Sequence, residues 1–131
     1  MDRSREKPVH WIGSARKDIQ AFPEAVRSEI GYALWQVQRG ETPLQAKPLH
    51  GFGGATVLEI VDDYATDTYR AVYTVRFADV VYVLHAFQKK ARHGRATPQR
   101  DMELIKRRLL EAQADYQRRQ REQGRSTENG A

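Results

Sequence analysis

The sequence predicts a single α+β domain in which a small antiparallel sheet packs against helices from both ends of the chain. Apolar residues recur at helical spacing near the N-terminus and again near the C-terminus. The middle of the chain instead contains three strand-like segments joined by short connections, which is typical of an antiparallel meander. The expected order of elements is therefore β-α-α-β-β-β-α.

The N-terminal third supplies one short strand and two helices. Residues 1–7 are charged and are expected to be frayed, whereas residues 9–12 suit a short strand. Ser14 is a suitable N-cap for a short helix that ends near Gln20. A second helix is expected between Pro23 and Gly40, with one apolar face formed by Val26, Ile30, Ala33, Leu34 and Val37.

Residues 41–54 are rich in glycine and proline and are expected to form a connection. Strands are then expected at residues 56–61, 69–76 and 80–87.

In the middle strand, alternation puts Arg70, Val72, Thr74 and Arg76 on the face opposite Tyr69, Ala71, Tyr73 and Val75. In the last strand, Val81, Val83, His85 and Phe87 alternate with Val80, Tyr82, Leu84 and Ala86, so both faces are apolar and the strand is expected to lie inside the sheet.

Thr97 and Pro98 open the expected final helix, with Thr97 as N-cap and Pro98 at the first helical position. The apolar seam of this helix contains Met102, Ile105, Leu109, Ala112 and Tyr116. Polarity rises after Tyr116. We therefore expect a folded domain over residues 8–120 and a disordered tail over residues 121–131.

The composition excludes several classes of protein. The 131 residues are 40% apolar and 30% charged, as in a soluble globular domain. There is no cysteine, and the four histidines lack metal-ligand spacing, so neither a metal nor another cofactor is expected. No apolar run approaches the roughly 20 residues of a membrane helix, and no signal peptide is recognisable. We expect a cytoplasmic protein with no membrane partner.

Positive charge is concentrated in one segment. Residues 85–108 contain eight Lys or Arg and two acidic residues, a local balance of +6 in a chain whose total is +5. Such asymmetry suits a polyanionic partner such as RNA, but a solvated basic helix accounts for it equally well.

Several short motifs, taken in order, resemble the RelE superfamily of bacterial toxins, and within it the phage-derived HigB-type branch. The matching segments are Lys47–Gly51, Leu58–Ile60, Tyr69–Tyr73, Leu84–Lys90 and Thr97-Pro98 followed by a helix. Together they extend over roughly residues 10–116. One position departs from the pattern, because Val61 stands where this branch commonly has an arginine after the Glu-Leu pair.

The resemblance implies the toxin of a type II toxin–antitoxin system. Such a toxin is a metal-independent endoribonuclease that cleaves mRNA, usually on the ribosome, and inhibits translation and growth. Its expected partners are mRNA, the ribosome and a cognate helix-turn-helix antitoxin. The alternative is a non-enzymatic module of RelE/ParE fold that binds a protein target or RNA without cleavage, and Val61 favours this alternative.

Metal-free RNA cleavage requires a base for the 2′-hydroxyl, cations for the phosphate and an acid for the leaving oxygen. Arg70 is the first candidate for phosphate stabilisation, with a cross-strand pair to Glu59 or Asp62 as the alternative. Lys89 and Lys90 are candidates for phosphate binding or proton transfer, or are plain solvated lysines. His85 is a candidate for proton transfer, although a satisfied core histidine is favoured at its position between apolar residues.

The remaining cations are candidates for binding the RNA backbone without reading its sequence. They are Lys47, Arg76, Arg92 and Arg95. Tyr69 and Tyr73 are candidates for stacking on bases, but strand alternation places them opposite Arg70 and favours core packing for both.

Overall fold

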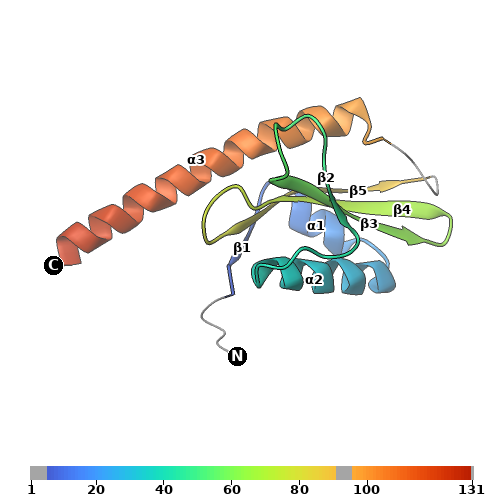
Figure 1. Cartoon of the computed structure of the whole chain (residues 1–131), viewed down its shortest axis with the longest axis horizontal. Helices are drawn as coiled ribbons and strands as arrows, with labels where there is room; N and C mark the ends of the chain where they lie inside the picture. Colours follow the sequence, from blue (N-terminus) through green and yellow to red (C-terminus); the bar gives the residue numbers. More distant parts are fainter. Residues whose placement is uncertain (1–5, 91–95, 131) are drawn as a thin grey trace.

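A five-stranded mixed sheet lies between one long helix and two shorter ones (Figure 1). The computed structural model describes residues 6–90 and 96–130, with side chains described as far as Gly124. The elements in chain order are β1 (Val9–Trp11), α1 (Ala15–Gln20), α2 (Glu24–Gln38), β2 (Ala46–Pro48), β3 (Val57–Tyr64), β4 (Asp67–Thr74), β5 (Val81–Lys89) and α3 (Gln99–Gly130).

The strands have the order β1-β5-β4-β3-β2, so β4 is the middle strand and β5 lies beside it. β1 runs parallel to β5, and the other neighbouring pairs are antiparallel. Helices α1 and α2 cover one face of the sheet and α3 covers the other (Figure 1). The predicted α+β class and the inner position of the last strand are confirmed.

The prediction missed strand β2, which falls inside the supposed connection at residues 41–54. β2 is three residues long and ends in Pro48, and it pairs with β3 at the edge of the sheet through the register Lys47 to Glu59. A short edge strand that tolerates proline has little periodicity to detect. This strand places Lys47 directly beside Glu59.

Two separate apolar layers sandwich the sheet. The layer beneath α1 and α2 includes Val26, Ile30 and Val37 from α2 together with Tyr69 and Tyr73 from β4. The layer beneath α3 includes Ile105, Leu109 and Ala112 from the helix together with strand residues such as Val72 and Leu84. Tyr69 and Tyr73 are 6% and 2% exposed, so they pack in the core and do not face a ligand.

An irregularity between β4 and β5 changes which way part of β5 faces. The register shifts between Val72 and Tyr73: Val72 pairs with His85, whereas Tyr73 pairs with Val83. The extra residue, Leu84, interrupts the alternation of β5, as a β-bulge does. His85 therefore lies on the α3 side with Leu84, and not on the Val81 and Val83 side that strict alternation predicts.

α3 begins at Gln99 and continues to Gly130, through the segment predicted to be a disordered tail. Its buried contacts end near Tyr116, and residues 117–124 are exposed. Glutamine, arginine and glutamate are good helix formers, so the helix continues without a core to bury it. In Figure 1 this part of α3 extends past the edge of the sheet. Among the described residues, no helix is apolar over a stretch long enough to cross a membrane.

Candidate functional site

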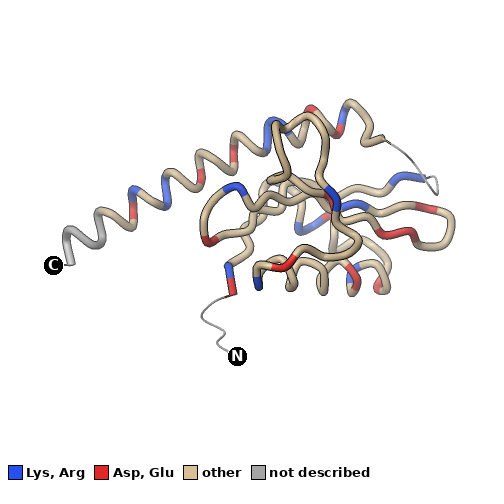
Figure 2. Tube along the Cα trace, in the orientation of Figure 1, with Lys and Arg blue, Asp and Glu red and all other residues tan. Residues whose placement is uncertain are grey.

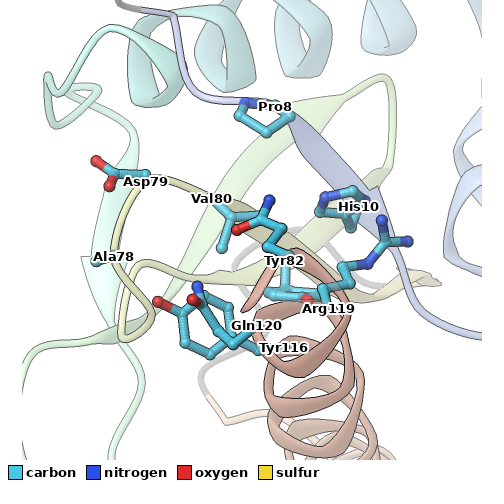
Figure 3. Close-up of a pocket in the computed structure, with 10 residues that line it drawn as sticks. Pro8, His10, Ala78, Asp79, Val80, Tyr82, Tyr116, Arg119 and Gln120 are labelled. Atoms are coloured by element: carbon cyan, nitrogen blue, oxygen red, sulfur yellow. The ribbon is translucent and has the colours of Figure 1, made fainter. Parts of the chain in front are cut away.

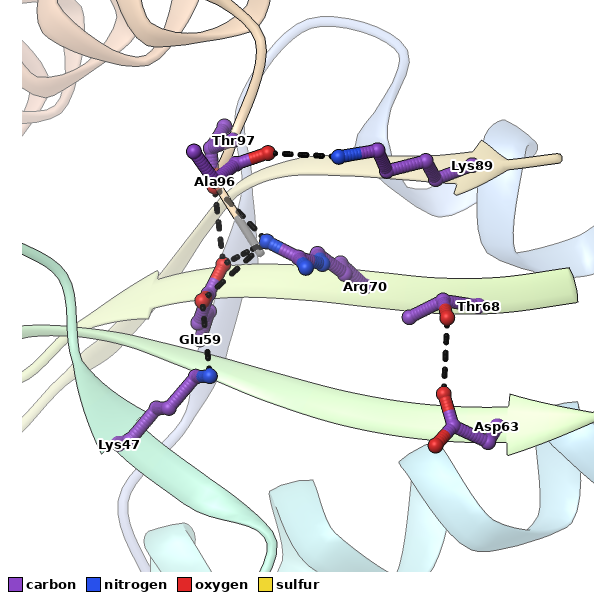
Figure 4. Close-up of polar contacts among 8 residues, drawn as sticks. All are labelled: Lys47, Glu59, Asp63, Thr68, Arg70, Lys89, Ala96 and Thr97. Carbon is purple, nitrogen blue, oxygen red and sulfur yellow. Dashed lines mark hydrogen bonds and ion pairs between the residues drawn. The ribbon is translucent and has the colours of Figure 1, made fainter. Parts of the chain in front are cut away.

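The centre of the candidate site is a buried ion pair between neighbouring strands β3 and β4. Arg70 is 1% exposed and Glu59 is 3% exposed. The Nη1 atom of Arg70 donates to both carboxylate oxygens of Glu59 at 3.4 Å (Figure 4). The guanidinium predicted to stabilise a phosphate is therefore turned toward a carboxylate, which is the cross-strand alternative, in a buried rather than a surface position.

Thr97 and Lys47 complete the surroundings of this pair. The Thr97 hydroxyl donates to Glu59 Oε2 at 3.2 Å and accepts from Arg70 Nη1 at 3.1 Å. Lys47 Nζ lies 3.9 Å from Glu59 Oε1 and its side chain is 57% exposed. Thr97 was predicted to cap α3, but its hydroxyl bonds to both members of the ion pair instead. The first helical hydrogen bond of α3 runs from the Met102 N–H to the Pro98 carbonyl.

A cleft of about 320 Å³ opens in front of this network, between β2 and the start of α3. It is lined by Lys47, Pro48, Leu49, His50, Glu59, Ala96, Thr97 and Met102. Arg70 is not among these residues, so the group that the cleft presents from the ion pair is the carboxylate of Glu59. The chemistry available in the cleft is therefore one carboxylate, one cation, one imidazole and one hydroxyl.

His50 was not among the predicted site residues, although it lies in the Lys47–Gly51 motif. It follows the end of β2 and lies on the wall of the cleft. The next residue, Gly51, has φ +100°, a value that side chains rarely allow, and so it turns the chain sharply after His50. The exposed imidazole of His50 makes no hydrogen bond to another described residue.

The structure brings only part of the predicted cation cluster near this cleft. Lys89 Nζ donates to the carbonyl of Ala96, a cleft-lining residue, at 2.9 Å (Figure 4). Lys90 is exposed at the end of β5. Arg92 and Arg95 lie outside the described residues.

Arg76 is separated from the cleft. It lies beyond the opposite end of β4, six residues or about 20 Å of extended chain from Arg70. Its Nε donates to the Thr56 hydroxyl at 3.2 Å and its Nη2 to the Phe52 carbonyl at 3.0 Å. Arg76 therefore holds the loop before β3 in place, and it is not among the residues that line the cleft.

His85 forms a polar bridge between the sheet and α3. Its Nε2 lies 2.7 Å from Asp101 Oδ1 and its Nδ1 lies 3.3 Å from Arg108 Nη1. A guanidinium only donates hydrogen bonds, so Nδ1 accepts and Nε2–H donates to Asp101. The ring is 7% exposed and stacks on Phe87 at 5.1 Å between centroids. This is the satisfied core histidine that its apolar surroundings favour.

A second cavity of about 270 Å³ lies where β1, the turn before β5 and the far part of α3 meet (Figure 3). The Tyr82 hydroxyl donates to Asp115 Oδ2 at 2.7 Å, and Arg119 Nε donates to the same oxygen at 2.8 Å. Burial raises the pKa of Tyr82, and the hydrogen bond to Asp115 raises it further. Burial also lowers the pKa of His10, with Arg119 acting in the same direction. These contacts fasten α3 to the sheet.

Charge along α3 is mixed in sign. Figure 2 shows Lys and Arg positions interspersed with Asp and Glu along the helix, while acidic residues gather at the tip of the β3–β4 hairpin. Residues 99–124 contain seven Lys or Arg and five Asp or Glu. The described side chains of α3 are therefore not uniformly basic.

The chain belongs to the phage-derived Gp49-like protein family, whose model matches residues 17–110. This range includes every described residue of the cleft and of the ion pair. Among solved structures, the chain is similar to one in the toxin–antitoxin complex RelBE2 from Mycobacterium tuberculosis, with 19% identity and a TM-score of 0.46. That alignment covers 69% of this chain and 99% of the other. A comparison with curated proteins gives no significant match.

Proposed function

We propose that the protein is the toxin of a type II toxin–antitoxin system, and that it cleaves mRNA without a metal ion. The observation that carries this proposal is the cleft between β2 and α3, which combines a carboxylate, a lysine and an imidazole. These are the groups that cleavage by the ribose 2′-hydroxyl requires. The motif order that resembles the RelE superfamily supports the same reaction.

The size and charge of the cleft suit a segment of single-stranded RNA. A volume of about 320 Å³ is at the lower end for small-molecule sites and admits about one nucleotide unit. Lys47 is exposed at its edge and Lys89 adjoins it through Ala96, so both suit contacts to the phosphate backbone. Among the described residues no group of three His, Asp or Glu side chains is placed to hold a metal ion, and the proposed reaction uses none.

The proposal extends to the cellular setting. We propose that the toxin acts in the cytoplasm on mRNA held by the ribosome, and that a cognate helix-turn-helix antitoxin neutralises it. An antitoxin that blocks the cleft would have to present acidic or polar groups to Lys47 and Lys89. Growth arrest on expression of the toxin alone, relieved by co-expression of the neighbouring gene, is the expected behaviour.

The direct test is to express the chain and follow growth and transcript integrity together. We expect transcripts to be cut within minutes of induction, and purified protein to cleave RNA, free or on ribosomes, equally well with and without EDTA. The variant to compare is Lys47→Ala, which removes an exposed cation from the cleft edge. It should weaken cleavage without affecting folding. Intact transcripts and normal growth in the presence of soluble protein would refute the proposal.

A second candidate is a non-enzymatic module that binds a protein target or RNA. Two observations favour it: Arg70 faces Glu59 and not the cleft, and Val61, directly opposite Arg70 in the sheet, supplies no second cation. Toxicity that persists while RNA stays intact and DNA-damage responses rise would select this candidate. Binding of RNA without cleavage would select its RNA-binding form.

A further inference from the structure

We infer that Glu59 is the general base and His50 the general acid of the cleft, and that Arg70 is a positioning residue for Glu59. This assignment rests on the proposed ribonuclease function and goes beyond it by naming the groups that move protons. It replaces the roles that the sequence suggests for Arg70 and His85. Neither of those side chains lines the cleft, whereas Glu59 and His50 both do.

Glu59 is held in one position by its contacts while one side faces the cleft. Arg70 reaches both of its oxygens at 3.4 Å, and Thr97 donates to Oε2 at 3.2 Å. The contacts from Arg70 are longer than the usual 2.7–3.2 Å of an N–H···O bond. They therefore orient the carboxylate and leave part of its hydrogen-bond acceptor capacity available. A carboxylate offers about four acceptor positions, which leaves Oε1, the oxygen nearer Lys47, able to accept a proton from a 2′-hydroxyl.

We assign His50 to the leaving-group side of the phosphate because it is the histidine that shares the cleft with Glu59. Lys47 is the register partner of Glu59, and His50 follows three residues later, about 10 Å along the chain. Both side chains line the same cleft, whose volume of about 320 Å³ can admit a phosphodiester. Lys47 lies between them in sequence and beside Glu59 in space, where it can balance the charge on the non-bridging oxygens.

The proposed step is balanced by these groups alone. Glu59 accepts the 2′-hydroxyl proton as the 2′-oxygen forms a bond to phosphorus. The bond from phosphorus to the 5′-oxygen breaks, and protonated His50 gives its proton to that oxygen. The products are a 2′,3′-cyclic phosphate and a 5′-hydroxyl end, and exchange of both side chains with water restores the starting state.

His85, which lies beneath α3, is excluded from this role by its contacts. Both of its ring nitrogens are engaged, by Asp101 and by Arg108, and the ring is 7% exposed beneath the helix. A proton on His85 would have no path to a substrate in the cleft while α3 stays in place. The assignment therefore distinguishes two histidines of the same chain by exposure and bonding.

The experiment compares the wild type with Glu59→Gln, His50→Gln and the control His10→Gln, whose histidine lines the separate second cavity. The substrate is an RNA with a mapped cleavage site, presented free or on the ribosome as the wild type requires. A second version carries a bridging sulfur in place of the 5′-oxygen at that site. Because a thiolate leaves without protonation, this version needs a base but no general acid.

We expect Glu59→Gln to slow cleavage of both substrates by about 10²–10⁴-fold. His50→Gln should slow cleavage of the normal RNA to a similar extent, lose the alkaline limb of the pH–rate profile, and cleave the sulfur substrate at nearly the wild-type rate. His10→Gln should match the wild type on both. Circular dichroism of each variant identifies loss of folding, and Glu59→Asp, which keeps the carboxylate, should retain part of the activity if Glu59→Gln unfolds.

Three results would overturn all or part of the assignment while leaving the ribonuclease intact, and two of them concern His50. One is a wild-type rate for His50→Gln on normal RNA, and the other is equal slowing of both substrates by that variant. Retention of full activity by folded Glu59→Gln would equally remove Glu59 as the base. A wild type that cleaves neither free nor ribosome-bound RNA would instead refute the proposed function, and the assignment with it.

Discussion

The buried ion pair between Arg70 and Glu59 makes a quantitative prediction about stability. Arg70 is the largest of the fully buried side chains. Arg70→Met keeps an unbranched chain of similar length but leaves the carboxylate of Glu59 buried opposite an apolar group. Breaking a buried pair in this way costs about 3–5 kcal/mol. We expect about 3 kcal/mol, the low end, because Thr97 and Lys47 still contact Glu59.

Urea unfolding followed by circular dichroism measures this loss, which should also lower the Tm by roughly 10 °C for a domain of this size. The double variant Glu59→Leu/Arg70→Met replaces both charges by apolar groups and should be more stable than Arg70→Met alone. Lys90→Met, at an exposed cation, should change stability by no more than about 0.5 kcal/mol. The claim that Arg70 and Glu59 form a buried ion pair would be refuted by either of two results. One is a loss of less than about 1 kcal/mol in unfolding free energy for Arg70→Met, and the other is a double variant whose loss equals the sum of the two single losses.

Three other predictions follow from particular contacts. Arg108→Ala should cost about 2 kcal/mol and increase hydrogen exchange in α3, because Arg108 bonds the Leu84 carbonyl and His85. Burial raises the pKa of Tyr73 to about 12, above its ordinary value near 10, so its contribution to stability is complete below pH 10 and is lost as the pH rises toward 12. Thermal unfolding between pH 9 and 11.5 should show that loss, and Tyr73→Phe should reduce the slope. In RNA-binding titrations, log K for RNA association falls with the logarithm of the salt concentration. Lys47→Ala should make the slope of this line shallower by about one.

The strand and helix pattern of the chain was predictable because most of its elements bury one regular face. α2 buries all five residues of its predicted apolar face. The apolar seam predicted for α3 is buried at Ile105, Leu109 and Ala112. The failures have local causes. β2 is too short for periodicity to register, and the bulge at Leu84 changes the facing of His85 in a way that alternation cannot foresee.

The site was only partly predictable for a different reason. The sequence singled out Arg70 as a phosphate-stabilising candidate and Lys47 as a backbone-binding candidate on separate segments, and the structure places both within reach of Glu59. It did not reveal which charge would face solvent, because that depends on the edge strand β2 and on the entry of α3 at Thr97. His50 stands in the Lys47–Gly51 motif, but nothing in the sequence assigned it a role, and one is suggested only once the walls of the cleft are known.

The ion pair beneath the cleft is hard to explain by stability alone. An apolar pair of similar volume is often as stable as a buried ion pair or more so, so a chain shaped only for folding would have little need of Glu59 and Arg70. A fixed carboxylate at the floor of a reactive cleft does need a buried partner to hold its orientation. The double variant separates the two explanations. If Glu59→Leu/Arg70→Met folds with near-wild-type stability and no longer cleaves RNA, the pair serves the reaction. If it folds and still cleaves, the pair is structural, and proton transfer must come from another group.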